Sequence, residues 1–198
     1  MLGTIVSVPV LAGIAASYER ISDGLAAAPG VAEIARGGNP SGPGFQAVPR
    51  LLATTAGDLP EQVTEECFGP VSVVARYDGE KELFAALEAL PSSLTATVLR
   101  GAGETELPLA VSRELRTRAG RLVYDAYPTG VAVSWAQHHG GPWPSTNSQH
   151  TSVGTTAIRR FLRPVTWQGA PQEVLPEELT DDYRGIPRRI DGVLELPR

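Results

Sequence analysis

The chain has 198 residues, of which 42% are hydrophobic and 20% are charged, so it is long enough to form one domain with a sizeable core. A net charge of -5 gives no electrostatic reason to expect nucleic acid or an anionic membrane as a partner. The longest apolar run, residues 5–16, is interrupted by Ser7, Pro9 and Gly13, and it is too short and broken for a membrane span.

Strand-like and helix-like runs alternate along the chain, a pattern that is typical of an α/β fold with a parallel sheet. The first helix is predicted to end before Pro29-Gly30, and one of its faces carries Ile14, Tyr18, Ile21 and Leu25. The further predicted elements are a Gly/Pro-rich loop at 37–44, helices at 80–90, 104–119 (kinked or restarted at Pro108) and 151–160, and strands at 47–53, 71–76, 94–100, 121–127, 131–135 and 162–167.

The segment Glu65-Glu66-Cys67-Phe68-Gly69-Pro70 places two carboxylates and an aromatic ring on a turn before an apolar run. An ionised carboxylate accepts hydrogen bonds through two oxygens, which suits the neighbouring hydroxyls of a ribose. A phenyl ring two residues on can lie against a flat heteroaromatic ring. We therefore predict that Glu66 and Phe68 form the edge of a cofactor site, and a solvated acidic turn before a strand is the alternative.

A second distinctive segment follows downstream, in which His139-Gly140-Gly141-Pro142-Trp143-Pro144 precedes Thr151-Ser152-Val153-Gly154-Thr155 and Arg160-Phe161-Leu162-Arg163-Pro164-Val165. Together the two segments resemble the C-terminal part of the NAD(P)-dependent aldehyde dehydrogenases of the 2-oxoglutarate-semialdehyde (2,5-dioxovalerate) type. In that family the acidic turn reads Glu-Glu-(Val or Ile)-Phe-Gly-Pro. The resemblance spans nearly the whole chain and is strongest after Leu94.

This resemblance implies an α/β fold in which residues 1–167 form the parallel-sheet second half of an aldehyde dehydrogenase catalytic domain and residues 168–198 form an extended C-terminal tail. It also implies NAD or NADP as the cofactor of the full enzyme, with Glu66 on the nicotinamide ribose and Phe68 orienting the ring. The family's nucleophilic cysteine lies nearly a hundred residues before the turn, whereas the 64 residues before Glu65 contain no cysteine. We therefore expect the nucleophile, the general-base glutamate and the nucleotide-binding half to be absent from this chain.

The resemblance places the loop at 138–144 near the substrate entrance. We predict that His139 or Trp143 contacts the aldehyde, and a purely structural loop of the same composition is the alternative. The polar side chains that follow are further candidates for this contact, namely Ser145, Thr146 and Asn147.

The single cysteine and the three histidines suggest two other kinds of site. Pairing of Cys67 with His138 or His139 would give a thiolate nucleophile, but the family fills this position with Val or Ile, so we interpret Cys67 as small apolar filler. No metal site is predicted, because the spacings of His138, His139 and His150 put no two of them on one helix face. One cysteine excludes an internal disulfide and agrees with a reducing cytoplasm.

Arg159, Arg160 and Arg163 form a basic cluster that suits a carboxylate or a phosphate, although such arginines more often pair with acidic neighbours. The resemblance implies that the next strand joins subunits, so an oligomer contact is predicted at Leu162, Pro164 and Val165. The tryptophans are interpreted as core or interface residues, namely Trp135, Trp143 and Trp167.

The sequence thus predicts the C-terminal part of a cytoplasmic aldehyde dehydrogenase that oxidises an aldehyde, 2-oxoglutarate semialdehyde being the one that the subgroup suggests, to its acid. The chain is expected to be inactive alone, and the full enzyme to be a homo-oligomer. Two alternatives stay open. One is a subunit of a split enzyme whose N-terminal half is a separate polypeptide, and the other is a non-catalytic remnant or binding module.

Overall fold

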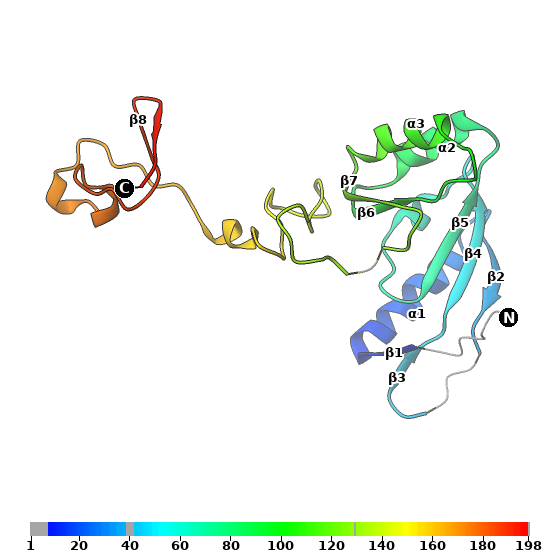
Figure 1. The fold of residues 1–198 in the computed structure, drawn as a ribbon. Coiled ribbons are helices and arrows are strands. Elements are labelled where there is room, and N and C mark those ends of the chain that lie inside the picture. The colour runs from blue at the N-terminus through cyan, green and yellow to red at the C-terminus, as the bar shows by residue number, and fades with distance from the viewer. Residues whose placement is uncertain (1–7, 39–41, 129, 198) are drawn as a thin grey trace. The chain divides into compact units, whose positions relative to one another are not determined.

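The computed structural model describes residues 8–38, 42–128 and 130–197, and it divides into a unit that ends at Arg160 and a unit that begins at Phe161 (Figure 1). Part of the predicted Gly/Pro-rich loop, residues 39–41, lies outside the described residues. The helices are α1 (Ala12–Ala26), α2 (Glu80–Ala89), α3 (Glu106–Leu115) and the short 3-10 helices η1 (Glu61–Thr64), η2 (Ala157–Phe161), η3 (Gln172–Val174) and η4 (Glu177–Leu179). The strands are β1 (Val8–Val10), β2 (Ala32–Arg36), β3 (Phe45–Ala47), β4 (Arg50–Thr55), β5 (Val71–Arg76), β6 (Ser93–Val98), β7 (Ala119–Tyr124), β8 (Arg188–Ile190) and β9 (Val193–Glu195).

Strand β4 is the centre of a three-stranded sheet, and it pairs antiparallel with β2 and parallel with β5. Alternate residues of β4 are buried, namely Arg50, Leu52 and Thr54, as the two-residue period of a strand requires. Burial of the Leu52 side chain stabilises the fold by about 2 kcal/mol. The strand predicted at 47–53 is divided in the structure, because Pro49 has no N–H to donate to a ladder.

Helix α1 buries Tyr18, Ser22 and Leu25, which are spaced four and three residues apart and so share one face. This face packs against β3. The helix ends at Ala26, and the chain then turns through Gly30 at a φ of 76°. The predicted first helix and its stop at Pro29-Gly30 are therefore confirmed.

A buried arginine ties α1, β2 and β4 together. The Arg50 guanidinium donates through Nε to Glu33 at 2.6 Å, and through one Nη to Asp23 at 2.6 Å and to the Ser22 hydroxyl at 3.0 Å. Only 7% of the Arg50 side chain is exposed, so these bonds replace the water that the cation loses on folding. The arginine thereby fixes the start of β4 against the helix.

Elements β5, α2, β6, α3 and β7 follow one another, and β6 and β7 pair in parallel on either side of α3 in the sequence. This alternation is the predicted α/β pattern, and the predictions for 71–76, 80–90 and 94–100 are confirmed to within two residues. Helices α2 and α3 lie side by side (Figure 1). Of the two predicted effects of Pro108, the structure shows no kink, and α3 begins at Glu106 with Pro108 in its first turn, where N–H groups have no partner within the helix.

Three predicted elements between residues 131 and 167 are wrong. Residues 131–135 form no strand, and the side chain of Val133 is 82% exposed with no neighbouring strand to cover it. The helix predicted at 151–160 is reduced to η2 at its end. Residues 162–167 form no strand either, and Pro164 within them has no N–H to donate.

The second unit contains η3, η4 and an antiparallel hairpin of β8 and β9. Asp191 and Gly192 join the two strands with φ of 46° and 83°, the left-handed conformation that two-residue hairpin turns require. Arg188 donates to the carbonyl oxygens of Thr180 and Tyr183 at 2.8 and 3.0 Å. The C-terminal tail therefore carries a small ordered hairpin.

Candidate functional site

The acidic turn at 65–70 is held by Tyr18 of α1. The buried Tyr18 hydroxyl donates to the carbonyl oxygen of Val48 at 2.5 Å and lies 3.4 Å from that of Pro70. A β-carbon on Gly69 would stand 2.2 Å from a ring carbon of Tyr18, so only glycine fits at this point of the turn. The tyrosine ring therefore sets the path of the chain between η1 and β5.

Cys67 points back toward the same helix. Its thiol contacts the carbonyl oxygen of Tyr18 at 3.9 Å, and burial raises the pKa of the thiol, an effect that Glu65 increases and Arg50 opposes. A raised pKa keeps sulfur protonated and unreactive at neutral pH. This arrangement favours a packing role for Cys67 over the thiolate-imidazole pair.

Glu66 and His139, which are far apart in the sequence, line one cavity of about 840 Å³, which we call the Glu66–His139 cavity. Its volume is in the range of small-molecule sites, about 300 to 1,000 Å³. Glu66 is exposed and His139 is half-buried. The wall is built from the end of η1, the start of β6, β7 and the loop that follows, and its other residues are Val63, Thr64, Leu90, Pro91, Ser92, Ser93, Leu94, Thr95, Arg121, Pro128, Pro144 and Ser145.

The backbone of His139 is fixed by the segment that follows it. Its N–H donates to the Thr151 hydroxyl at 2.9 Å, and its carbonyl oxygen accepts from both the amide and the hydroxyl of Ser152 at 3.0 Å. Further along the loop, the Thr146 hydroxyl donates to the carbonyl oxygen of Gly141 at 2.7 Å. Thr146 is therefore a structural residue of this loop.

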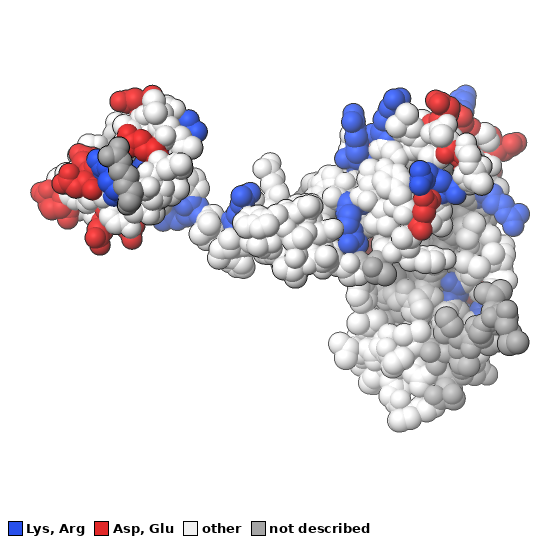
Figure 2. All heavy atoms as spheres, viewed as in Figure 1, with Lys and Arg blue, Asp and Glu red and all other residues white. Residues whose placement is uncertain are grey.

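The other two predicted site residues lie elsewhere. Phe68 is 69% exposed and borders a hollow formed by β1, the start of α1 and the Gly69-Pro70 turn. Figure 2 shows few charged side chains on the visible face around α1, β1 and β3, whereas charged side chains gather over α2 and α3. Trp143 is 77% exposed and is not among the residues that line the Glu66–His139 cavity, although its neighbour Pro144 is.

Arg121 lines the same cavity, although the sequence analysis did not single it out. It lies on β7 directly opposite Thr95 of β6. The signal in the sequence is an arginine at the start of an otherwise apolar strand, where a charged residue is unusual. Arg121 gives the wall of the cavity a cationic residue in addition to the acidic Glu66.

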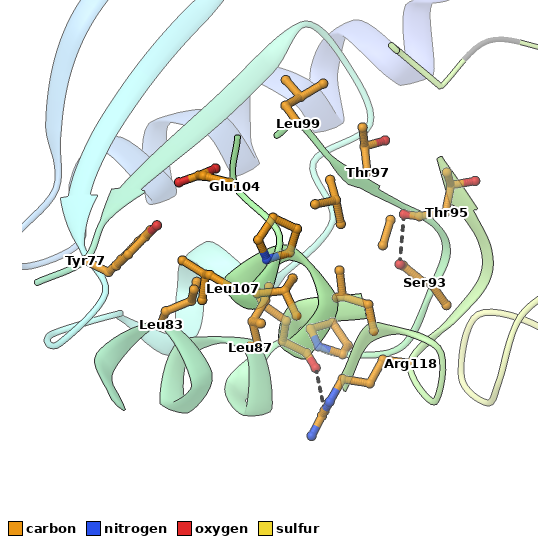
Figure 3. A pocket seen from close by; sticks show the side chains of 18 residues that line it. Tyr77, Leu83, Leu87, Ser93, Thr95, Thr97, Leu99, Glu104, Leu107 and Arg118 are labelled. Atoms are coloured by element: carbon orange, nitrogen blue, oxygen red, sulfur yellow. Dashed lines mark hydrogen bonds between the residues drawn. The ribbon is translucent and has the colours of Figure 1, made fainter. Parts of the chain in front are cut away.

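A second cavity of about 500 Å³ lies between α2, α3 and β6 (Figure 3). Leucine side chains such as Leu83, Leu87 and Leu107 dominate its wall, with Tyr77 and Glu104 toward one end and Arg118 toward the other. The carboxylate of Glu104 is bound to the backbone N–H of Gly101 at 2.7 Å. None of the four predicted site residues lines this cavity, and we assign no chemistry to it.

Among the described residues, no group of three or more His, Cys, Asp or Glu side chains is placed to hold a metal ion. No helix in this part of the chain is both long and apolar enough to cross a membrane. Of the two alternatives for the tryptophans, core or interface, the core alternative is wrong, since Trp135 is 75%, Trp143 77% and Trp167 46% exposed; the interface alternative stays a prediction.

The fold is that of part of an aldehyde dehydrogenase. Betaine aldehyde dehydrogenase from Staphylococcus aureus, solved in complex with NAD+, matches 77% of this chain and 30% of its own, with a TM-score of 0.59 and 19% identity. Aldehyde Dehydrogenase C from Pseudomonas syringae, solved as a mutant with NAD+ and octanal, matches 78% of this chain and 30% of its own, with a TM-score of 0.56 and 24% identity. The predicted α/β fold class is confirmed.

No protein-family model matches the chain. Alpha-ketoglutaric semialdehyde dehydrogenase from Acinetobacter baylyi is 46% identical over 137 residues, which are 67% of this chain and 26% of the relative. Alpha-ketoglutaric semialdehyde dehydrogenase 2 from Azospirillum brasilense is 42% identical over 187 residues, which are 92% of this chain and 35% of the relative. The chain thus spans about a quarter to a third of the length of these relatives. The predicted resemblance to aldehyde dehydrogenases of this type is confirmed.

Proposed function

We propose that this chain supplies the cofactor edge and the substrate edge of an NAD(P)-dependent aldehyde dehydrogenase that oxidises an aldehyde to its carboxylic acid. The observation that carries the proposal is the Glu66–His139 cavity, because it brings a residue predicted to bind cofactor and one predicted to bind substrate to the same wall. The identity to the two semialdehyde dehydrogenases supports 2-oxoglutarate semialdehyde as the aldehyde.

Glu66 is the residue that we assign to the ribose of the nicotinamide cofactor. Its carboxylate is exposed at the cavity, where its oxygens can accept hydrogen bonds from two ribose hydroxyls. The ring of Phe68 is also exposed, but it borders a different hollow, so its contact with the nicotinamide ring is the less supported half of the prediction. When bound, NAD or NADP supplies the hydride acceptor.

On the substrate side, His139 is the group that we assign to the aldehyde. His139 is half-buried, and its imidazole nitrogens can donate or accept a hydrogen bond. The hydrogen bonds of its backbone to Thr151 and Ser152 give the residue a fixed position. Contact by Trp143 is also part of the proposal, because its exposed side chain precedes Pro144, which lines the same cavity.

The nucleophilic thiolate that this oxidation needs is assigned to residues outside these 198. Cys67 does not fit the role, because burial raises the pKa of its thiol and its sulfur contacts the backbone of Tyr18. In this proposal the chain binds and orients the cofactor and the aldehyde, and it does not itself form the covalent intermediate. Whether the missing part belongs to the same polypeptide or to a separate subunit, its addition is required for turnover.

The test is reconstitution with a polypeptide that contains a nucleotide-binding domain and a catalytic cysteine from such a dehydrogenase. Activity is followed by the absorbance of the reduced nicotinamide, and cofactor affinity by its fluorescence. We expect Glu66→Gln to weaken cofactor binding about tenfold, because a charge-assisted bond is lost. The neighbouring Glu65→Gln is the matched control and should change affinity less than about twofold. Zero turnover on mixing, or equal effects of the two variants, would overturn the proposal.

A non-catalytic role in association is the second candidate. The observation that favours it is the exposure of apolar side chains at the start of the second unit, where Phe161 is 83%, Leu162 65% and Val165 58% exposed. Such side chains are normally covered by a partner or a second copy. We therefore also propose a homo-oligomer contact at 161–165, in a cytoplasmic protein. Sedimentation of Val165→Asp tests it, and an unchanged oligomeric state would exclude this contact.

A further inference from the structure

The backbone N–H and the carbonyl oxygen of His139 are both hydrogen-bonded to the same short segment, residues 151–152. Thr151 accepts from the His139 N–H at 2.9 Å, and its own hydroxyl proton goes to the carbonyl oxygen of Val153 at 2.8 Å. Ser152 donates twice to the His139 carbonyl oxygen, from its amide and from its hydroxyl, both at 3.0 Å. Every backbone polar group of His139 is therefore bound to residues 151–152.

The two residues of this segment differ in burial. Thr151 is 3% exposed, whereas Ser152 is exposed to solvent. Water cannot replace the Thr151 hydroxyl, so its removal leaves the His139 N–H and the Val153 carbonyl oxygen without their partner. Water can replace the Ser152 hydroxyl, and the Ser152 amide still binds the His139 carbonyl oxygen. Thr151 is thus the residue on which the position of His139 depends.

The next residue in the chain is also fixed. The carbonyl oxygen of Gly140 lies against the backbone of Gly120 on β7, a strand that lines the same cavity through Arg121. His139 is therefore held by Thr151 and Ser152 directly and by β7 through Gly140.

We propose that Thr151 is a positioning residue. It holds His139 at the wall of the Glu66–His139 cavity so that the imidazole contacts the proposed substrate, 2-oxoglutarate semialdehyde. This inference rests on the proposed function. It assigns a role to the Thr151-Ser152 segment that is separate from any contact of that segment with ligand, since neither residue lines the cavity.

The experiment is a double-mutant cycle on the full 198-residue chain, with alpha-ketoglutarate, the acid product of the proposed oxidation, as the probe. Dissociation constants are measured by NMR titration for the wild type, His139→Ala, Thr151→Val and the double variant. We expect Thr151→Val to weaken binding about tenfold when His139 is present and to have no further effect when His139 is alanine. Thr151→Ser keeps the hydroxyl and should restore the affinity to within about twofold of the wild type.

Two further variants complete the design. Thr117→Val removes a local hydroxyl bond of similar length, to Glu114 at 2.8 Å, away from this loop, and should leave the affinity unchanged. Ser152→Ala tests the same segment at an exposed position where folding is not at risk, and should weaken binding about twofold, again only with His139 present.

The outcomes separate this inference from the proposed function. If His139→Ala weakens binding but Thr151→Val and Ser152→Ala do not, or if they weaken it equally in the His139→Ala background, the positioning role is overturned and the proposed substrate contact stands. If the wild type does not bind alpha-ketoglutarate, or His139→Ala binds it as the wild type does, the proposed contact of His139 fails and the positioning role fails with it.

Discussion

The carbonyl oxygen of Gly140 lies 1.7 Å from the point where a β-carbon on Gly120 would stand. The loop that carries His139 therefore meets β7 backbone to backbone, at a separation that only glycine permits. Gly141 makes the equivalent approach to β6, where its β-carbon would stand 2.5 Å from the carbonyl oxygen of Ser93. Gly120 of β7 and Gly141 of the loop thus explain how a long loop without regular structure keeps a defined place on the sheet.

Replacement of Gly120 by alanine should release this loop. The added methyl group overlaps a backbone oxygen that cannot rotate away, so we expect a loss of about 1 to 3 kcal/mol in the free energy of unfolding. Urea denaturation measures the loss. Gly24→Ala in α1 is the control, because nothing lies within 4 Å of its added carbon and alanine favours a helix by about 0.5 to 1 kcal/mol. Wild-type stability of Gly120→Ala would show that the loop does not depend on this contact.

The two carboxylates bound to Arg50 should contribute unequally to the stability of the fold. The Glu33 side chain is 28% exposed and that of Asp23 is 71% exposed, although both lie 2.6 Å from the guanidinium. We expect Glu33→Gln to cost about 1 to 3 kcal/mol of stability, since it weakens a charge-assisted bond to a buried cation. Asp23→Asn should cost less than about 1 kcal/mol, because solvent screens that pair. Urea unfolding of both variants checks the order, and equal or reversed losses would contradict it.

Helices and strands with a clear period were predictable from the sequence alone. The face of α1 and the alternating strand β5 follow directly from the spacing of their apolar residues. Between 131 and 167 the same reasoning failed, because Val131 and Val133 have strand-forming side chains but pair with no strand among the residues that the structure describes. Strand propensity describes how a residue fits a sheet and does not provide the sheet.

The candidate site was predictable in part for a similar reason. Glu66 and His139 were each predicted as site residues from a local segment, and that role stays a prediction. Their common cavity could not be predicted, because it depends on how η1, β6 and β7 pack. Phe68 shows the limit most clearly. It is two residues from Glu66, yet it borders a different hollow, together with Gly69 and Pro70.

Cys67 should react slowly with alkylating reagents in the folded chain. Burial raises the pKa of its thiol, so the reactive thiolate is scarcer than in the unfolded chain, and access is reduced as well. We expect alkylation by iodoacetamide near neutral pH to be at least about tenfold slower in the native chain than in urea. Mass spectrometry of timed samples measures both rates. Cys67→Val should keep the native stability, and a native rate as fast as the unfolded one would reinstate Cys67 as a candidate nucleophile.

The hydrogen bonds between Asp125 and Arg100 should make the stability of the fold depend on pH. Asp125 lies at the end of β7 with a φ of 51°, and its carboxylate accepts hydrogen bonds from the backbone N–H and from Nε of Arg100, both at 2.8 Å. These bonds lower the pKa of the Asp125 carboxyl group below its ordinary value. Because the folded-state pKa is depressed, the stabilisation is complete above the unfolded pKa of about 4 and is lost as the pH falls through the folded-state value. Asp125→Asn preserves the preference for this backbone conformation and should be less stable than the wild type near neutral pH, with a difference that shrinks below about pH 4. Urea unfolding over a pH series measures the difference. Arg100→Gln is the control, and it should flatten the dependence of stability on pH in the same way as Asp125→Asn. A difference that stays constant down to the lowest pH would mean that the Arg100 bonds do not stabilise the ionised carboxylate.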